Sequence, residues 1–401
     1  MPVGYLLTVV FLATGTLCAL KPLRRPLALA RPGFLLGVVF VELPFLFLAL
    51  LALASAVAAA GGDLDAFPGT ALAVAAGATA AGLAAVAVRG LRDRGRIRRA
   101  VAEGLGARWQ AAAQTRPGRR LRGRTPARAL LGPFFRRHRH VRHVADLPYG
   151  DAGPRQLLDV YHHRALPTGA PVLVHLHGGS FLRGRKDTQS LPLLHRLAAD
   201  GWLCVSANYR LRPTARHPDE LVDAKRILAW VRAHAHEYGG DPATLVVSGS
   251  SAGGHIAAMA ALTAGDREFQ PGFEDADTSV SAAVCLGAYY GTHPDGGPRS
   301  APPARITADA PPFLVAHGDQ DTLVPVESAR AFAARLRATS ASPVVLAELR
   351  GGHHAFDLFH SPRFEALIDG IAAFAAALPG ARDTDTDGER NRERTPGGDC
   401  A

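Results

Sequence analysis

The pentapeptide Gly249-Ser250-Ser251-Ala252-Gly253 restricts the fold of this 401-residue chain more than any other feature. The apolar run Leu245–Val247 precedes it, and a helical pattern over Ala252–Thr263 follows it. A serine in such a motif, between a strand and a helix, is typical of a sharp turn that exposes the serine hydroxyl. The flanking glycines let the strand and the helix approach closely around a strained residue. We therefore predict a buried strand, a tight turn and a helix, with Ser251 as a candidate nucleophile.

A second glycine motif favours this interpretation over a chance match in a chain that contains 42 glycines. His177-Gly178-Gly179-Ser180 directly follows the apolar run Pro171–Leu176, which is predicted to be a buried strand. Consecutive glycines after a strand allow backbone N–H groups to face a cavity, as the oxyanion of an acyl-transfer intermediate requires. The predicted oxyanion donors are the backbone N–H groups of Gly178, Gly179 and Ala252. The alternative is a structural Gly-Gly turn.

A polar loop after a further predicted strand carries two candidate carboxylates. The apolar run Pro312–Ala316 leads into a loop that contains Asp319 and Asp321. A carboxylate at this end of a strand can orient a catalytic histidine and select its tautomer. We predict this role for Asp321, since Asp319 directly follows Gly318, where aspartate is common for local turn geometry.

The histidine that would act as general base belongs to the loop after the apolar run Val344–Leu349. This loop contains His353 and His354 side by side, and we predict His354 as the base, with His353 as the alternative. The chain order Ser251, Asp321, His354 is that of the α/β-hydrolases and differs from the orders in chymotrypsin and subtilisin. Each of the three residues follows a predicted strand, and open parallel sheets place their sites at this edge.

From about residue 140 to residue 378 the chain resembles the hormone-sensitive-lipase-like carboxylesterases, and among these the membrane-attached bacterial lipases and esterases. The residues that carry the resemblance are His177–Gly179, Asn208–Leu211, Pro218–Trp230, Gly240–Pro242, Gly249–His255, Asp321 and Gly352–Phe356. The resemblance implies ester hydrolysis without a cofactor, and a triad of Ser251, Asp321 and His354. One departure is Ser180, which stands where this group often has a third glycine and leaves the preferred acyl length open.

Apolar runs alternate with helical patterns over residues 141–379, which predicts a mostly parallel, doubly wound sheet and hence the α/β-hydrolase fold. The predicted strands are Gln156–Tyr161, Val172–Leu176, Trp202–Ala207, Leu245–Val247, Val280–Leu286, Phe313–Ala316 and Val344–Leu349. The four cysteines lack the spacing of metal ligands, and the sequence has no Gly-rich phosphate loop. We therefore predict neither a metal nor another cofactor.

Three apolar blocks precede this domain, at Val3–Leu20, Leu43–Ala60 and Thr70–Val88. Each has about 18 or 19 residues, close to the length that spans a bilayer. No basic residue precedes the first block, which argues against a cleaved signal peptide. We predict an all-α transmembrane region over residues 1–90 with about three helices. Glu42 would lie at the membrane interface, just before the second block, and a functional carboxylate within a membrane helix is the alternative.

Charged residues predict the orientation of these helices. Basic residues lie between the first two blocks and after the third, whereas Asp63 and Asp65 lie between the second and third. The positive-inside rule then places the hydrolase domain in the cytoplasm, in a multi-pass membrane protein. Residues 91–140 are predicted to form a basic juxtamembrane linker that attracts anionic lipid head groups, without a packed face from Val101 onward. A merely solvated linker is the alternative, and we predict no nucleic-acid binding because the run contains no recognition module.

The substrate predicted from these features is a small-molecule or lipid acyl ester. The same triad also fits an amide, as in arylformamidases, or acyl transfer to an alcohol, and a non-catalytic membrane scaffold is the alternative outside enzymes. Residues 380–401 are almost without hydrophobic side chains and are predicted to be disordered. Because the predicted catalytic groups all lie beyond residue 140, we expect a chain that starts there to be soluble and active on a short ester.

Overall fold

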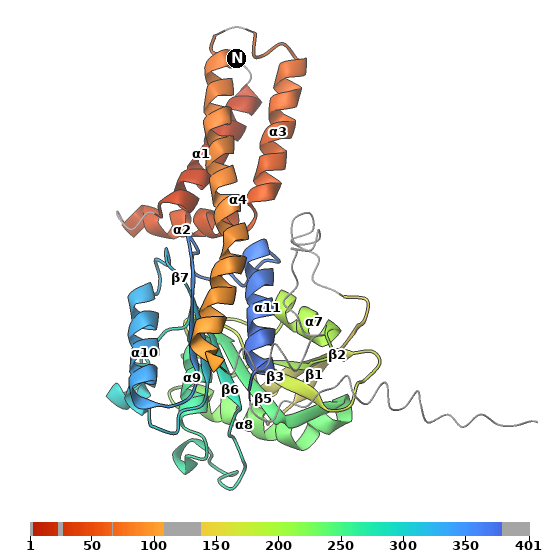
Figure 1. Cartoon of the computed structure of the whole chain (residues 1–401), viewed down its shortest axis with the longest axis vertical. Helices are drawn as coiled ribbons and strands as arrows, with labels where there is room; N and C mark the ends of the chain where they lie inside the picture. Colours follow the sequence, from red (N-terminus) through yellow and green to blue (C-terminus); the bar gives the residue numbers. More distant parts are fainter. Residues whose placement is uncertain (1–2, 23–26, 66, 108–137, 379–401) are drawn as a thin grey trace, which may run out of the picture.

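A bundle of N-terminal helices stands on an α/β domain, and one long helix runs from the first into the second (Figure 1). The computed structural model describes residues 3–22, 27–65, 67–107 and 138–378, without the side chains of residues 27–31. The predictions for the basic run over 108–137 and for the tail over 380–401 fall outside the described residues.

The α/β domain is built on an eight-stranded sheet in the order β1-β2-β4-β3-β5-β6-β7-β8. The first two neighbouring pairs are antiparallel and the remaining pairs are parallel, which confirms the mostly parallel sheet. Each predicted strand is present, from β2 to β8. β1 was not predicted, because it is an edge strand whose side chains are mostly exposed and form no apolar run. The strands are β1 (Val141–Pro148), β2 (Leu157–His163), β3 (Ala170–Leu176), β4 (Leu203–Ala207), β5 (Gly240–Ser250), β6 (Ala282–Leu286), β7 (Phe313–Gly318) and β8 (Val344–Leu349).

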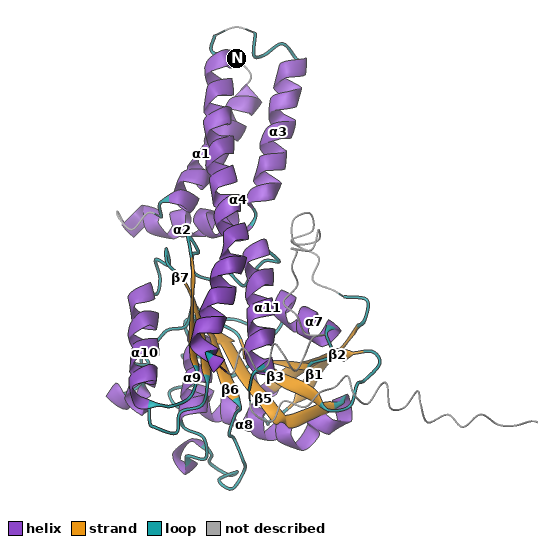
Figure 2. Cartoon of the chain, viewed as in Figure 1, coloured by secondary structure: helices purple, strands orange, loops and turns teal. Residues whose placement is uncertain are grey.

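Helices cover both faces of the sheet (Figure 2). One face packs against α8 (Asp219–His234), α9 (Ala252–Leu262) and α10 (Val326–Thr339). The opposite face packs against α7 (Leu191–Ala199) and α11 (Pro362–Ala376). Strands covered on both faces are apolar throughout, which is why the central strands appear in the sequence as continuous apolar runs.

The N-terminal bundle contains α1 (Val3–Leu20), α2 (Leu27–Glu42), α3 (Pro44–Ala60) and α4 (Gly69–Leu105). Helices α1 and α4 are long and apolar enough to cross a membrane, and α2 with α3 makes a third candidate span if the bent pair counts as one. Within that pair, Pro32–Glu42 and Pro44–Ala60 meet at 89°. Helix α2 was not predicted, and it lies across the base of the bundle, where the bundle meets the α/β domain (Figure 1).

Helix α4 extends well beyond the apolar block that predicted it. It continues without a break through the arginines after Val88 as far as Leu105, so part of the predicted linker is helical. Val101 and Leu105 are buried in the core beside β8 and α11, which corrects our expectation of a segment without a packed face. A Cβ atom at Gly104 would lie 2.7 Å from Val345 Cγ2, so the last turns of α4 belong to the fold of the α/β domain.

A buried charge cluster joins the bundle to the α/β domain. The guanidinium group of Arg363, at the start of α11, donates to Glu42 Oε1 at 2.9 Å and to Asp93 Oδ2 at 2.6 Å. Ser361 Oγ also donates to Glu42, and all four side chains are buried. The sequence analysis did not predict this pairing of Glu42, because its partner Arg363 lies 321 residues away in the sequence and no local pattern reveals it.

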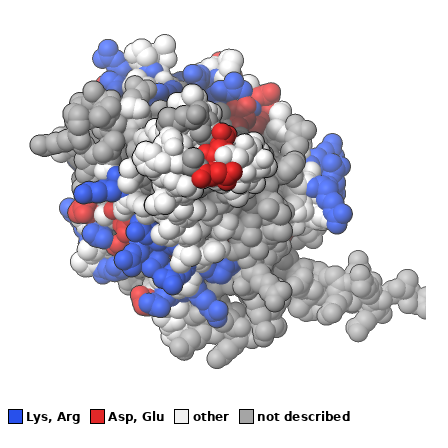
Figure 3. All heavy atoms as spheres, turned by 90° about the horizontal axis from the view of Figure 1, so that it is seen from above, with Lys and Arg blue, Asp and Glu red and all other residues white. Residues whose placement is uncertain are grey.

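Charge is distributed unevenly along the axis of the molecule. Asp63 and Asp65 are exposed in the turn between α3 and α4, at the far end of the bundle. Viewed down the bundle, Lys and Arg side chains surround it on the wider domain below (Figure 3). The predicted orientation in a membrane depends on the basic residues next to the apolar blocks, such as Lys21 and Arg89, and on Asp63 and Asp65 at the opposite end.

Candidate active site

The turn at Ser251 joins β5 to α9 and holds the serine in an unusual backbone conformation, with φ 53° and ψ −116°. The neighbouring glycines are required sterically. A Cβ atom at Gly249 would lie 2.1 Å from the carbonyl oxygen of Gly253, and one at Gly253 would lie 2.2 Å from that of Leu176. The backbone N–H of Ser251 donates to the carbonyl of Leu286 at 2.9 Å, which ties the turn to the end of β6.

The structure brings Ser251, His354 and Asp321 together from three separate loops. Nε2 of His354 lies 2.8 Å from Ser251 Oγ, and Nδ1 lies 2.6 Å from Asp321 Oδ2. Both distances are within hydrogen-bonding range, so the imidazole can accept the serine proton at Nε2 while Nδ1–H donates to the carboxylate.

Asp321 is held as a carboxylate by several donors. Its Oδ1 accepts the backbone N–H groups of Leu323 and Val324, each at 2.8 Å. Its Oδ2 lies 3.3 Å from His317 Nε2. Burial opposes ionisation, but the hydrogen bonds from His317 and His354 hold the pKa of Asp321 below its usual range.

The two alternative residues lie elsewhere. Asp319 accepts the backbone N–H of Gly351 at 2.6 Å, and burial raises its pKa. The ring of His353 is buried, and a Cβ atom at Gly37 of α2 would lie 2.6 Å from its Cε1 atom. Burial lowers the pKa of His353 to about 4. His353 therefore packs against the N-terminal bundle, and in the described part of the chain Ser251 is hydrogen-bonded to His354 instead.

The loop after β3 differs in one respect from the expected oxyanion hole. The backbone N–H of Gly178 donates to Gln189 Oε1 at 2.7 Å, so this N–H is already occupied. The N–H groups of Gly179 and Ala252 donate to no other residue in the described part of the chain, and the same holds for Ser180. These three groups remain as candidate donors to an oxyanion.

The buried carboxylate of Asp357, which the sequence analysis missed, supports the glycine loop after β3. Asp357 accepts hydrogen bonds from Ser250 Oγ at 2.5 Å, from Gln189 Nε2 at 3.0 Å and from Ser190 Oγ. Gln189 in turn holds Gly178, so the series from Asp357 to Gly178 links the histidine loop to the glycine loop. The position of Asp357, three residues after His354, was its only signal in the sequence.

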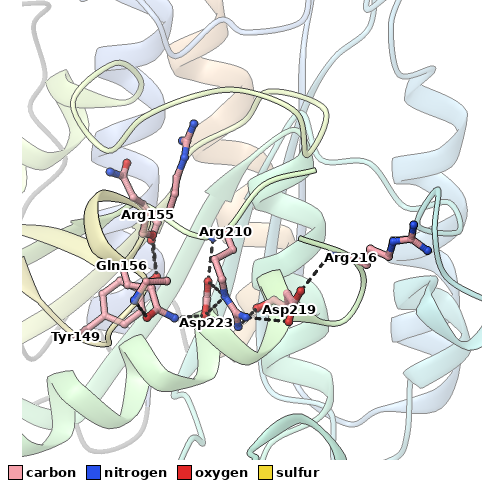
Figure 4. Close-up of polar contacts among 9 residues, drawn as sticks. Tyr149, Arg155, Gln156, Arg210, Arg216, Asp219 and Asp223 are labelled. Carbon is pink, nitrogen blue, oxygen red and sulfur yellow. Dashed lines mark hydrogen bonds and ion pairs between the residues drawn. The ribbon is translucent and has the colours of Figure 1, made fainter. Parts of the chain in front are cut away.

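A second support comes from the segment after β4. The ring of Tyr209 stacks on that of His177 with centroids 4.4 Å apart, and its hydroxyl donates to the carbonyl of His177 at 2.7 Å. The next residue, Arg210, binds Asp223 at 2.8 Å and Asp219 at 2.9 Å on α8 (Figure 4). Asp223 also accepts from Gln156 at 2.7 Å. This network fixes Tyr209, and through it the start of the glycine loop.

One group of side chains could hold a metal ion among the residues that the structure describes. His217, Glu220 and His293 have ligand atoms that all lie within 4.8 Å of one another. His217 Nδ1 already lies 2.8 Å from Glu220 Oε1, so a hydrogen bond accounts for this pair without an ion. None of the three belongs to the arrangement around Ser251.

Comparisons with known proteins match this chain to one family model and to relatives described as ester hydrolases. Residues 158–284 match the family model described as BD-FAE. The probable carboxylic ester hydrolase LipM of Mycobacterium tuberculosis is 43% identical over 277 residues, which are 62% of this chain and 64% of the relative. Esterase LipC of the same organism is 40% identical over 266 residues, 59% of this chain and 66% of the relative. The alignments thus span just under two thirds of these relatives' own length.

Two solved structures with similar architecture are described as esterases. A truncated carbohydrate esterase from gut microbiota has a TM-score of 0.51 and 20% identity, covering 58% of this chain and 96% of that one. The butyrate-bound esterase Est2 of Thermogutta terrifontis has a TM-score of 0.51 and 24% identity, covering 57% and 91%. At these identities the likeness establishes architecture alone. Together with the strand order and the turn at Ser251, it shows that residues from β1 to α11 have the α/β-hydrolase fold.

Proposed function

We propose that this chain is a serine hydrolase that cleaves carboxylic esters through an acyl-enzyme on Ser251. The observation that carries the proposal is the pair of hydrogen-bonding distances at His354, 2.8 Å to Ser251 Oγ and 2.6 Å to Asp321 Oδ2. The descriptions of the relatives as esterases and as a carboxylic ester hydrolase support an ester as the bond cleaved. The Thermogutta esterase was solved with butyrate bound, which supports a carboxylic acyl group as part of the substrate.

In the first half of the reaction, Ser251 Oγ attacks the ester carbonyl carbon while its proton passes to His354 Nε2. Asp321 stays ionised and stabilises the imidazolium that forms. The tetrahedral intermediate then breaks its bond to the alcohol, which leaves with the proton from His354. In the second half, water attacks the acyl carbon, His354 accepts its proton, and the acid departs as Ser251 regains a proton.

The negative charge that develops on the carbonyl oxygen requires donors. We assign this role to the backbone N–H groups of Gly179, Ser180 and Ala252, because that of Gly178 is bound to Gln189. Losing one such donor typically slows the chemical step by about 100- to 1000-fold. We therefore also propose that Gln189 and Tyr209, which hold the glycine loop, keep these N–H groups in position.

A panel of p-nitrophenyl esters of graded acyl length, run beside an arylformamide and with an added alcohol acceptor, tests the type of bond. We expect the esters to be cleaved faster than the formamide, and water to be the main acceptor. Preferential cleavage of the formamide, or acyl transfer to the alcohol, would assign the same triad to an amidase or an acyltransferase.

We also propose that the bundle anchors the protein in a membrane, as in the membrane-attached branch of the hormone-sensitive-lipase-like group, with the α/β domain in the cytoplasm. The support is the two or three candidate spans and the charge asymmetry along the bundle. The protein should remain in the membrane fraction after carbonate washing. Protease added to intact cells should leave the α/β domain uncut, and its digestion there would overturn the cytoplasmic assignment.

A further inference from the structure

Helix α2 lies against the loop that carries the catalytic histidine. The ring of Phe34 lies with its centroid 6.4 Å from that of His354. One helical turn later, Gly37 approaches His353 so closely that an added Cβ atom would lie 2.6 Å from the ring. The same helix face therefore contacts both histidines of the loop, and Phe34 stands beside the one that binds Ser251.

Two contacts tie α2 and the neighbouring end of α1 to the α/β domain near His354. At its C-terminal end, Glu42 binds Arg363 and Ser361 in the buried cluster described above. Before its N-terminal end, the carbonyl of Leu20 at the end of α1 accepts from Gln320 Nε2 at 3.2 Å. Gln320 is the immediate neighbour of Asp321, so this contact ties the bundle to the loop that carries Asp321.

A different face of α2 is apolar and exposed. Leu35, the residue after Phe34, is 57% exposed. Exposed apolar side chains also occur on α3 and α1, at Leu46, Leu50, Leu53 and Leu17. If these candidate spans cross a membrane, the exposed apolar side chains would be covered by lipid. Because α2 meets α3 at 89°, it would lie along the membrane surface if α3 crosses it.

We propose that α2 forms a hydrocarbon-binding wall of the active site, with Phe34 contacting the long alkyl arm of an ester that enters from the bilayer. This inference rests on the proposed esterase function and names its substrate class: esters with at least one long hydrocarbon arm, dissolved in the membrane. The carbonyl must lie beside Ser251 Oγ, and Phe34 stands close enough to His354 for one arm of the substrate to reach it. Phe34 is thus a specificity-determining residue and not part of the triad.

The first test compares Phe34→Ala with wild type in the full-length protein reconstituted in phosphatidylcholine vesicles. Losing the contact of a phenyl ring with hydrocarbon should lower kcat/KM for a long-chain ester by roughly 10-fold. The rate on p-nitrophenyl acetate should stay within about twofold, since acetate does not reach the wall.

Dodecanoyl esters of a short alcohol and acetyl esters of dodecanol show which arm lies on Phe34. The matched control is Phe67→Ala, an exposed phenylalanine at the far end of the bundle.

Equal losses on short and long esters would overturn the inference, because Phe34 would then act only by holding His354. Unchanged rates on both would overturn it as well. If wild type cleaves no ester, the proposed function fails. A second measurement then still tests whether α2 contacts hydrocarbon at Phe34. Tryptophan fluorescence of Phe34→Trp, above that of wild type, should be quenched by brominated phosphatidylcholine as strongly as that of Leu53→Trp. Quenching at position 53 without quenching at position 34 would show that the wall is closed to hydrocarbon.

Discussion

At the scale of single residues, the candidate triad is held by backbone groups more than by side chains. Asp321 accepts two backbone N–H groups, which fix its carboxylate before it meets His354. Ser251 depends on two neighbours that lack a Cβ atom. Such preorganisation lowers the reorganisation that the transition state requires. Substitutions that keep a carboxylate or hydroxyl but move the backbone should therefore be as harmful as substitutions that remove the group.

We expect His354→Ala to reduce kcat by about 10⁴-fold while leaving the protein folded, because it removes the proton acceptor of Ser251. His353→Ala should instead lower the free energy of unfolding, because His353 is buried against α2 and does not contact the serine. Steady-state kinetics and urea unfolding of the two variants separate these effects. Comparable losses of kcat from both variants, in folded protein, would mean that the base has been misassigned.

Buried histidines also predict how stability depends on pH. Burial lowers the pKa of His177 and of His353 to about 4. In the unfolded chain a histidine has a pKa of about 6.5, so between these values the unfolded state binds more protons than the folded state. The stability is complete above pH 6.5 and decreases as pH falls towards 4, by up to roughly 3 kcal/mol per histidine.

Urea unfolding of the full chain in detergent, measured from pH 7.5 to pH 4, checks this prediction. His353→Gln should make the decrease smaller, because it removes one buried group that must stay neutral. The partly exposed His234, replaced by Gln, is the control for loss of an imidazole. An unchanged slope in His353→Gln would contradict the prediction.

At the scale of elements, Arg363 joins α11 to both α2 and α4. Arg363→Met leaves the carboxylates of Glu42 and Asp93 buried without their partner, which should destabilise the protein by about 3–5 kcal/mol. The control is Arg330→Met, which breaks an exposed pair with Glu348 and should cost about 1 kcal/mol or less. Thermal unfolding of both variants measures the difference. Equal, small effects would show that the cluster does not hold the bundle to the domain.

The elements that could be predicted from the sequence are those whose burial is continuous. Strands β3, β5 and β7 lie in the interior of a sheet that helices cover on both faces. Each therefore forms a continuous apolar run that is easily recognised in the sequence. Strand β1 pairs along one edge and α7 has nine residues, so neither leaves a strong pattern. The grouping of Ser251, Asp321 and His354 could be predicted because each of them follows a strand in a recognisable motif. Asp357 could not, since Ser250, Ser190 and Gln189 surround it only after folding.

At the scale of the whole molecule, the bundle and the α/β domain share a core. Ile97, Val101 and Leu105 of α4 pack with β8 and α11, and Asp93 pairs with Arg363. This changes our expectation for a chain that starts at residue 140, because that chain would expose the core surface that α4 covers. We now expect it to be poorly soluble and unstable, although it retains the triad.

A chain that starts at residue 90 provides the comparison, since it keeps the buried half of α4 and Asp93 but lacks the candidate spans. It should unfold at a higher urea concentration than the chain from residue 140, because it retains the apolar contacts of Ile97, Val101 and Leu105. Unfolding monitored by circular dichroism tests this. Equal stability of the two chains would show that the domain folds without α4.

The central claim is that Ser251 is the nucleophile of an ester hydrolase, and covalent labelling tests it most directly. The full-length protein is treated with a fluorophosphonate, digested and mapped by mass spectrometry, and p-nitrophenyl butyrate hydrolysis is followed in parallel. We predict one adduct, on Ser251, that abolishes hydrolysis in proportion to labelling, and neither labelling nor hydrolysis in Ser251→Ala. An adduct on Ser250 or another serine, or full hydrolysis by Ser251→Ala, would contradict this account.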